Sequence, residues 1–368
     1  MKILHAFTLQ SPDNAFGGPI RVALNLAHEL KSRDIKVELV GGCRDYPTIP
    51  QEIEGINANL FAVRQIHAKL GFSGLISLKL LAWAWRNVRN FDVVHIHLAR
   101  DLITLPITFI CRLRNVPYVI QGHGMIDPTQ RATGRILDFL LVRKSLIQAS
   151  KLLYLTEQEQ QDYPAVAKSA LSNLAFLPNG VPAQSKSSAV ERTSISFISR
   201  LQERKRPTRF VEMAAKLSGD ENFSDFKIAG ADEGELNAVL SLIEKHALAQ
   251  RVTYVGPKDH DGVLDLLSRT LILVLPSVNE PFPMIILEAL SCGIPVVLTD
   301  SCGLAPYIQR GNAGIVTDGS VDGLVNAVKV ITQDLLTYSA SALELAQKEF
   351  SMKHIGDELL AIYRAATS

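Results

Sequence analysis

The chain has 368 residues, of which 47% are hydrophobic and 20% charged, and its formal net charge at pH 7 is +1. This composition excludes a disordered chain, and the length suits two domains of ordinary size. No apolar stretch reaches the roughly 18 uncharged residues of a membrane-spanning helix. Neither half carries the dense basic and aromatic stripe of a nucleic-acid-binding surface.

The first residues favour a strand over a signal peptide, because the apolar run that follows Met1 is too short for a secretion signal. The cysteines are scattered and have neither metal-ligand nor disulfide-framework spacing; they are Cys43, Cys111, Cys292 and Cys302. We therefore expect a cytoplasmic protein with reduced thiols.

Short β-branched runs alternate with segments of helical periodicity along the chain. In the first half, strands are predicted at 1–7, 37–40, 92–97 and 117–120, and a helix at 20–31. The second half restarts the pattern, with strands at 194–198, 227–229, 252–255, 271–275 and 295–298 and helices at 208–217 and 236–247. This alternation predicts two parallel sheets made of right-handed βαβ units.

A polar, Ser-rich and aperiodic segment at 182–188 separates the two halves. It predicts a linker, with the domain boundary near 183–192. The final segment, 352–366, has the apolar spacing of a helix that would cap one of the domains. The expected division is therefore 1–183, 184–350 and a terminal helix within 351–368.

Paired glycines, Gly17 and Gly18, follow the first predicted strand and open the first helix. Glycine lets the backbone approach a phosphate at a helix amino terminus. The spacing is not that of the G-x-G-x-x-G dinucleotide fingerprint, and Gly-Gly turns are common, so this motif alone is a weak signal.

Residues 64–90 hold both tryptophans of the chain among basic and apolar residues. A basic, apolar helical stretch with tryptophan can lie on an anionic membrane surface, and Arg131, Arg135, Arg143 and Lys144 could extend that surface. The other interpretation is a core helix with ordinary solvated charges.

Three histidines stand at or after predicted strands. His123 lies between Gly122 and Gly124, so its ring is accessible and can donate or accept a proton near neutral pH. His95 and His97 share one strand face. We interpret that pair as structural, because no third ligand is spaced to complete a metal site.

A basic cluster at 200–206 follows a strand and precedes a helix. Its cations would lie at the carboxyl edge of the sheet, where ligands bind in doubly wound folds, and they could neutralise a diphosphate. The alternative is a solvated basic loop.

Glu280 and Glu288 flank a Pro-rich turn and the helix predicted to begin near Pro283. The first amides of a helix form an anion site, and carboxylates nearby can accept hydrogen bonds from sugar and ribose hydroxyls. The alternative is a helix-start acid at Glu280 and a surface residue at Glu288.

Taken in order, these motifs resemble those of the family-4 retaining glycosyltransferases of GT-B fold, across essentially the whole chain. The resemblance rests on Gly17-Gly18, the strand 93–97, His123-Gly124, 178–181, Arg200 with Lys205, Gly256, and the E-x7-E pair Glu280 and Glu288. It departs from the family at Ser199, where glycine is commoner, and at 303–306, which lacks an acidic residue. The departure at 303–306 weakens inferences about the nucleobase loop.

The resemblance implies two facing Rossmann-like domains, an active site in the cleft between them, and a terminal helix that crosses back to the N-terminal, acceptor-binding domain. Arg200 and Lys205 would hold the donor diphosphate, Glu280 the donor sugar and Glu288 the ribose. His123 would lie beside the donor sugar and Gly17 and Gly18 near the phosphate. The loop at Gly256 would line the nucleobase, and the amides of Phe282, Pro283, Met284 and Ile285 mark the sugar and phosphate side.

The function implied is transfer of a hexose from a UDP- or GDP-linked donor to an acceptor hydroxyl, with retained anomeric configuration, in cell-envelope or exopolysaccharide and glycolipid assembly. No D-x-D-like cluster suggests a metal, and we expect no cofactor. The acceptor would be a glycan or a lipid-linked molecule, and the protein would be cytoplasmic or peripheral at the inner membrane face.

Other functions stay open. A sugar-nucleotide epimerase or a non-catalytic nucleotide-sugar-binding subunit would share the fold. An NAD-dependent oxidoreductase also has Rossmann halves, although the missing fingerprint disfavours it.

Overall fold

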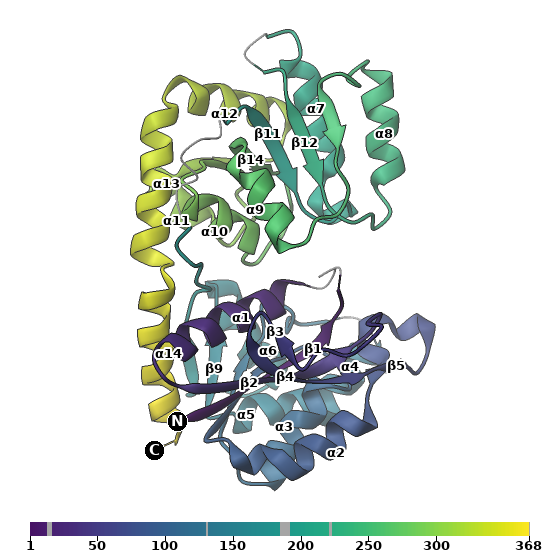
Figure 1. Cartoon of the computed structure of the whole chain (residues 1–368), viewed down its shortest axis with the longest axis vertical. Helices are drawn as coiled ribbons and strands as arrows, with labels where there is room; N and C mark the ends of the chain where they lie inside the picture. The colour runs from purple at the N-terminus through teal and green to yellow at the C-terminus, as the bar shows by residue number, and fades with distance from the viewer. Residues whose placement is uncertain (13–16, 130–131, 185–191, 221–222, 368) are drawn as a thin grey trace. The chain divides into compact units, whose positions relative to one another are not determined.

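The computed structural model describes residues 1–12, 17–129, 132–184, 192–220 and 223–367. The chain divides into two compact units, Met1–Gly180 with Met352–Ser368, and Val181–Ser351 (Figure 1). Of the segment expected to form a linker, 182–188, residues 185–188 lie outside the described residues.

An eight-stranded sheet, in the order β10-β9-β8-β7-β1-β2-β4-β3, forms the centre of the first unit. Its strands pair in parallel except for β3 with β4. They are β1 (Lys2–Gln10), β2 (Lys36–Cys43), β3 (Glu52–Ile53), β4 (Ile56–Ala62), β7 (Val93–His97), β8 (Tyr118–Gln121), β9 (Lys151–Tyr154) and β10 (Leu174–Phe176).

Helices cover both faces of this sheet, and the two-residue alternation of strand side chains decides which residue meets which helix. Leu4 and Ala6 face a core shared with α2 and α3, whereas Phe7 packs in a second cluster with α1. The helices are α1 (Gly17–Ser32), α2 (Leu78–Asn87), α3 (Thr104–Leu113), α4 (Ala132–Leu137), α5 (Arg143–Gln148), α6 (Glu157–Ala167) and α14 (Met352–Thr367).

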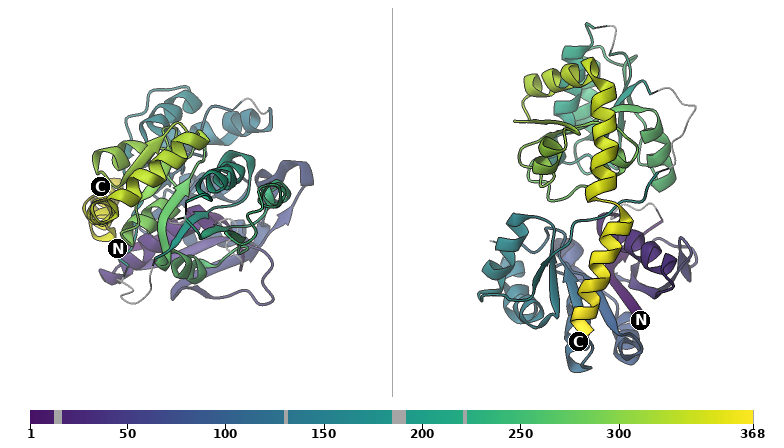
Figure 2. Two further views of the ribbon diagram at one scale, coloured as in Figure 1. Left: turned by 90° about the horizontal axis from the view of Figure 1, so that it is seen from above. Right: turned by 90° about the vertical axis from the view of Figure 1, so that its left-hand side faces the viewer.

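The last helix, α14, belongs to the first unit, where it packs on α1, β7 and β8. Its residue Thr367 lies with Met1, Asp92 and Pro117 around a shallow hollow at the start of the strands, and the two ends of the chain lie close together (Figure 2). The end of the described chain therefore closes onto the edge of the sheet where the chain begins.

The second unit contains a fully parallel sheet of six strands in the order β13-β12-β11-β14-β15-β16. Its central strand β14 is almost entirely buried, as expected for a parallel strand covered on both faces. The strands are β11 (Ser194–Ile198), β12 (Phe226–Ala229), β13 (Val252–Tyr254), β14 (Thr270–Leu275), β15 (Val296–Thr299) and β16 (Gly314–Thr317).

Helices of the second unit follow its strands in the chain, as βαβ units require. They are α7 (Pro207–Leu217), α8 (Leu236–Lys245), α9 (His260–Ser268), α10 (Met284–Ser291), α11 (Ala305–Arg310), α12 (Val321–Gln333) and α13 (Leu335–Glu349). Each unit is thus a Rossmann-like domain, which confirms the predicted fold class.

The helical interpretation of 64–90 is wrong for its first half. Residues Arg64–Gln65 and Leu75–Ile76 form a small antiparallel ribbon, β5 with β6, around a 3-10 segment, Ala68–Gly74. Gly71, with φ of +52° and ψ of −133°, interrupts that segment, so helical geometry cannot continue through it. Only α2 is an α-helix in this stretch. Within the described ranges, no helix is long and apolar enough to cross a membrane.

Candidate active-site residues

The basic cluster lies where β11 ends in the second unit. After β11, a short 3-10 turn at Glu203–Lys205 leads to Arg206, whose left-handed backbone (φ 52°) precedes α7 and its first residue, Pro207. The turn directs Lys205 inward, where it is buried, while Arg200 and Arg204 stay partly exposed. The sequence predicted this position at the carboxyl edge of the sheet.

Lys205 forms an ion pair with Glu280, which precedes α10. The same carboxylate oxygen, Glu280 Oε2, accepts a hydrogen bond from Arg204 Nη1 at 2.8 Å. Only 8% of Glu280 is exposed. Burial lowers the pKa of Lys205, and the Glu280 carboxylate opposes that shift. The buried Glu280 carboxylate thus offsets the positive charges of Lys205 and Arg204, which would otherwise repel each other strongly.

Arg200 makes a separate ion pair, with Glu233 at 2.7 Å. It lies near enough to Lys205 to contribute to the lowered pKa of that amine. The structure therefore brings together Arg200, Arg204, Lys205 and Glu280, including the three residues that the sequence assigned to phosphate and sugar binding.

The helix α10 begins one residue later than expected, because Pro283 is its N-cap and Met284 its first residue. Phe282 is buried and packs edge-to-face on Tyr307 and Phe350, so its side chain belongs to the core. What this segment can offer a ligand is backbone amide groups. Glu288 is only 7% exposed, so the alternative interpretation as a surface residue is wrong.

Gly256 follows β13 in a left-handed conformation (φ 74°), and its carbonyl accepts a hydrogen bond from Gly230 at 3.1 Å. A Cβ at Gly230 would lie 1.9 Å from the carbonyl oxygen of Ser199. Glycine is therefore required where the ends of β11 and β12 approach each other, directly beside the loop that the resemblance gives to the nucleobase.

In the first unit, Gly17 and Gly18 open α1. A Cβ built on Gly18 meets no atom within 4 Å among the described residues. Phe16, which precedes the pair, lies outside the described residues.

His123 follows β8 with a left-handed backbone (φ 53°), which is unusual for a residue with a side chain. Glu159 of α6 holds the loop in this conformation: its Oε1 accepts from the amide of Gly124 and its Oε2 from the amide of Leu155, both at 2.8 Å. Tyr163 adds a bond to the amide of Gly122 at 2.9 Å. Such an over-determined, strained loop is typical of functional sites.

Neither Glu159 nor Tyr163 was identified from the sequence. The pattern Thr156-x-x-Glu159 resembles a capping box, in which the glutamate bonds back to the first residue of the motif. Thr156 does cap α6. The glutamate instead bonds to a loop 35 residues away, a contact that no local pattern reveals.

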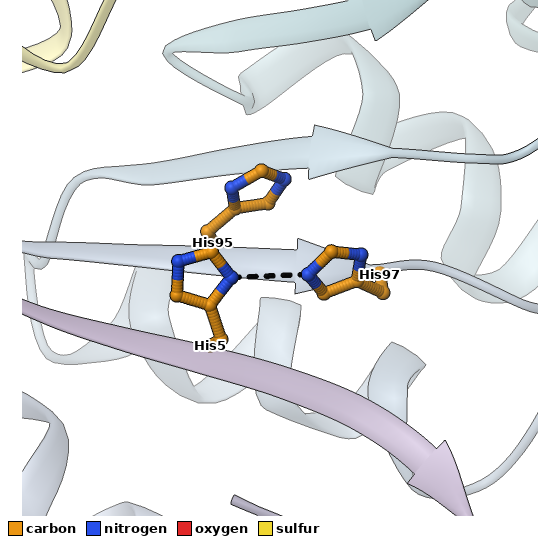
Figure 3. A group of neighbouring side chains, drawn as sticks. All are labelled: His5, His95 and His97. Carbon is orange, nitrogen blue, oxygen red and sulfur yellow. Dashed lines mark hydrogen bonds between the residues drawn. The ribbon is translucent and has the colours of Figure 1, made fainter. Parts of the chain in front are cut away.

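The sequence analysis found no third ligand spaced to complete a metal site with His95 and His97, but the structure places one beside them. His5, on the adjacent strand β1, is in register with His95 and completes a buried group of three (Figure 3). His5 Nδ1 lies 3.1 Å from His97 Nε2, and His97 Nδ1 lies 2.8 Å from His123 Nε2. His123 of the loop is thus joined by hydrogen bonds to the interior of the sheet.

Comparison with known proteins gives two family matches. The model described as glycosyl transferases group 1 matches residues 183–341, and that of the glycosyl transferase 4-like domain matches residues 17–180. The two matches fall one on each half of the chain.

Among curated relatives, D-inositol 3-phosphate glycosyltransferase of Mycolicibacterium smegmatis is 23% identical over 99% of this chain and 90% of its own length. The enzyme of the same name from Rhodococcus opacus is 27% identical over 48% of this chain. That match spans only 41% of the Rhodococcus protein, so the chain covers less than half the length of this relative.

Solved structures show the same fold. Anabaena HepE, in complex with UDP and glucose, superposes with a TM-score of 0.76 at 18% identity, covering 98% of both chains. TarM of S. aureus superposes with a TM-score of 0.75 at 14% identity, covering 99% of both chains.

Proposed function

We infer a function from the premise that the chain belongs to the family-4 glycosyltransferases of GT-B fold. We propose that it transfers a hexose-type sugar from a UDP- or GDP-linked donor to an acceptor hydroxyl. The observation that carries the proposal is the cluster of Arg200, Lys205 and Glu280 at the carboxyl edge of the second sheet. The UDP and glucose named for HepE, which has the same fold, are consistent with such a donor.

In this proposal, Arg200 and Lys205 hold the donor diphosphate and stabilise it as a leaving group. The bond between the sugar C1 and the phosphate oxygen breaks, and a bond from the acceptor oxygen to C1 forms. The acceptor proton passes to the departing diphosphate on the same face, which retains the anomeric configuration. Because cationic side chains provide the charge, we propose that the transfer needs no metal ion.

The remaining assignments follow the family resemblance. Glu280 accepts hydrogen bonds from the donor sugar, Glu288 from the ribose, and the first amides of α10 face the sugar and phosphate. For the first unit, the resemblance implies that His123 lies beside the donor sugar near the reacting carbon and that Gly18 approaches the phosphate. The buried position of both glutamates supports binding roles, since an ordinary surface acid would be solvated.

The acceptor is proposed to be lipid-linked or a glycan of the cell envelope, reached at an anionic membrane surface. Exposed aromatic residues of the first unit each carry an arginine over the ring: Trp85 with Arg114, Phe109 with Arg112, and Phe139 with Arg143. Exposed Leu78, Leu113, Ile136 and Leu140 add apolar area. Aromatic rings paired with cations suit the interface of an anionic bilayer.

Nucleotide binding tests the proposal directly. We expect UDP or GDP, but neither ADP nor NAD, to raise the melting temperature of the protein. A ligand at 100 times its Kd adds about 2.7 kcal/mol to the free energy of unfolding. Arg200→Ala should weaken nucleotide binding about 10- to 100-fold, since a hydrogen-bonded charge contact is lost. The matched control is Arg209→Ala, an exposed arginine of α7 paired with Glu212.

A shift with NAD alone would replace the proposal by an oxidoreductase. A shift with UDP but no transfer to any hydroxyl would favour the epimerase or the binding subunit. Retention is read from the proton NMR coupling of the anomeric position in the product, and metal independence from turnover in EDTA.

Flotation with anionic and neutral liposomes tests the membrane surface. Phe139→Ser with Leu140→Ser should reduce binding to anionic vesicles. Leu336→Ser, at an 85% exposed leucine of α13 in the second unit, serves as the control. Absence of binding at low salt would contradict this part of the proposal.

A further inference from the structure

Five side chains of the first unit form one continuous hydrogen-bonded series. His123 Nε2 bonds to His97 Nδ1 at 2.8 Å, and His97 Nε2 to His5 Nδ1 at 3.1 Å. His5 Nε2 lies 3.4 Å from the hydroxyl of Tyr363, which in turn bonds to His95 Nδ1 at 2.7 Å. The series runs from a loop at the end of β8 to the helix α14, 240 residues later in the chain.

The four rings in this series are neutral at pH 7. Burial lowers the pKa of His5 and of His123 to about 3. Burial also lowers the pKa of His95 and His97 well below the ordinary value, and neighbouring histidines add to the effect. A neutral imidazole has one N–H donor and one acceptor nitrogen. Each ring within the series therefore donates from one nitrogen and accepts at the other, so the hydrogen bonds between the histidines all run in one direction along the series.

A metal ion does not fit the same residues. His95 and His97 are stacked, with ring planes 7° apart and centroids 4.6 Å apart. Nitrogen lone pairs lie in the ring plane, so those of two parallel stacked rings do not converge on one ion. His5 Nδ1 and His97 Nε2 also lie 3.1 Å apart, which is the length of a hydrogen bond with the proton on one of the two nitrogens.

The Tyr363 hydroxyl, which lies between His95 and His5, decides on which nitrogen each histidine carries its proton. Among the described residues, His95 Nε2 and Gln121 Oε1 are buried without a regular hydrogen bond. The Gln121 amide nitrogen donates to Asn179 at 3.0 Å, which leaves its oxygen as an acceptor. The Tyr363 hydroxyl has one proton to donate, and its 2.7 Å contact with His95 Nδ1 has the length of an O–H donor bond, whereas its contact with His5 Nε2 is 3.4 Å long, so His95 Nδ1 accepts from Tyr363. His95 therefore carries its proton on Nε2.

The remaining protons of the series are assigned from His95 toward His123. With Nδ1 of His95 as an acceptor, the Tyr363 hydroxyl donates to it and can accept from His5 Nε2. His5 Nδ1 then accepts from His97 Nε2, and His97 Nδ1 accepts from His123 Nε2. All four histidines carry the proton on Nε2, and His123 keeps Nδ1 as its free acceptor.

We propose that Tyr363 is a positioning residue, which fixes His123 in the Nε2–H tautomer through His5 and His97. Nδ1 of His123, which makes no hydrogen bond in the described part of the chain, is then the atom that accepts from a ligand. Only the ligand-facing role of His123 rests on the proposed function; the proton order does not.

Long-range proton–nitrogen NMR of the ¹⁵N-histidine-labelled protein reads each tautomer directly. In the wild type we expect His5, His95, His97 and His123 all as Nε2–H. Finding His123 as Nδ1–H, or finding different tautomers at His97 and His123, would overturn the proposal. This NMR experiment uses the wild-type protein, so it does not depend on the folding of a variant.

Tyr363→Phe removes the hydroxyl that orders the series. We expect the His123 signals to show a population of the Nδ1–H tautomer. Tyr118→Phe is the matched control, because it removes another buried hydroxyl of the same unit, one that donates to Ser145, and should leave His123 unchanged. An unchanged His123 tautomer in a folded Tyr363→Phe protein would contradict the role of Tyr363.

Turnover of the donor separates this inference from the proposed function. Tyr363→Phe should lower kcat and leave UDP affinity unchanged, since the tyrosine acts on the tautomer of His123 alone. Failure of UDP or GDP to bind the wild type would overturn the proposed function, while the NMR result would still decide the proton order.

Discussion

Lys205 and Glu280 are 75 residues apart in the chain and form an ion pair in which both side chains are buried. Arg204 bonds to the same carboxylate and is partly exposed. The pair therefore has an asymmetry: Glu280 has a second cation beside it, whereas no other carboxylate in the described part of the chain forms an ion pair with Lys205.

We predict that Glu280→Gln destabilises the fold more than Lys205→Met does. Loss of Glu280 leaves a buried amine without its anion, a change worth about 3–5 kcal/mol, whereas loss of Lys205 leaves Glu280 paired with Arg204. Urea unfolding measures both variants. Arg209→Met, which breaks an exposed pair with Glu212, should change stability by less than about 1 kcal/mol. Equal losses in the two variants would contradict the asymmetry.

The same variants separate phosphate from sugar binding. Lys205→Met should weaken UDP or GDP binding. Glu280→Gln should keep nucleotide binding and lose turnover of the nucleotide sugar, because its carboxylate is assigned to the sugar hydroxyls. Calorimetry with the nucleotide, and turnover with the sugar donor, distinguish the two. If Glu280→Gln weakens nucleotide binding and Lys205→Met does not, the assignments of the two residues to sugar and phosphate are reversed.

Acid should destabilise the protein below about pH 6.5. His5 and His123 have pKa values of about 3 in the fold, and the unfolded chain has the ordinary value near 6.5. Between these values the unfolded chain binds more protons, so stability falls as pH is lowered, by up to about 1.4 kcal/mol per pH unit for each ring. Above pH 6.5 this contribution is complete.

The slope of unfolding free energy against pH measures this effect. His123→Asn should make it shallower, because asparagine tolerates the left-handed backbone and does not titrate. A slope in His123→Asn equal to that of the wild type would show that His123 is not a buried neutral ring.

Glu159→Gln should loosen the His123 loop. The amide nitrogen of glutamine cannot accept, so either the bond from Leu155 or the two bonds from Gly124 and Tyr163 are lost, at a cost of about 1–3 kcal/mol for each bond. We expect faster amide exchange at Gly124 and lower kcat. Glu157→Gln, exposed in the same helical turn, is the control. Unchanged exchange at Gly124 would show that Glu159 does not hold the loop.

Gly18→Ala should separate folding from binding. No described atom lies within 4 Å of the added methyl group, and alanine favours the helix, so stability should stay equal or rise by up to about 1 kcal/mol. If a phosphate occupies that space, donor affinity should fall. Thermal melting and donor binding test the two effects, and full donor affinity would exclude Gly18 from the site.

The sequence alone was sufficient for the alternation of strands and helices, because apolar periodicity and β-branching act over a few residues. The same local signals located the turn after β11, the start of α10 to within one residue, and the loop of His123. They failed at 64–77, where a glycine in a left-handed conformation breaks a stretch whose composition is helical.

Tertiary structure alone decided which residues are partners. His5 meets His95 because β1 and β7 are neighbours in register, although 90 residues separate them in the chain. Glu159 reaches Gly124 and Tyr363 reaches His95 through packing of helices on the sheet. Burial is likewise a property of the whole fold, and it turned Glu280 from a solvated acid into the counter-ion of Lys205. Such contacts depend on the order of strands and the faces of helices, which pattern along the chain does not encode.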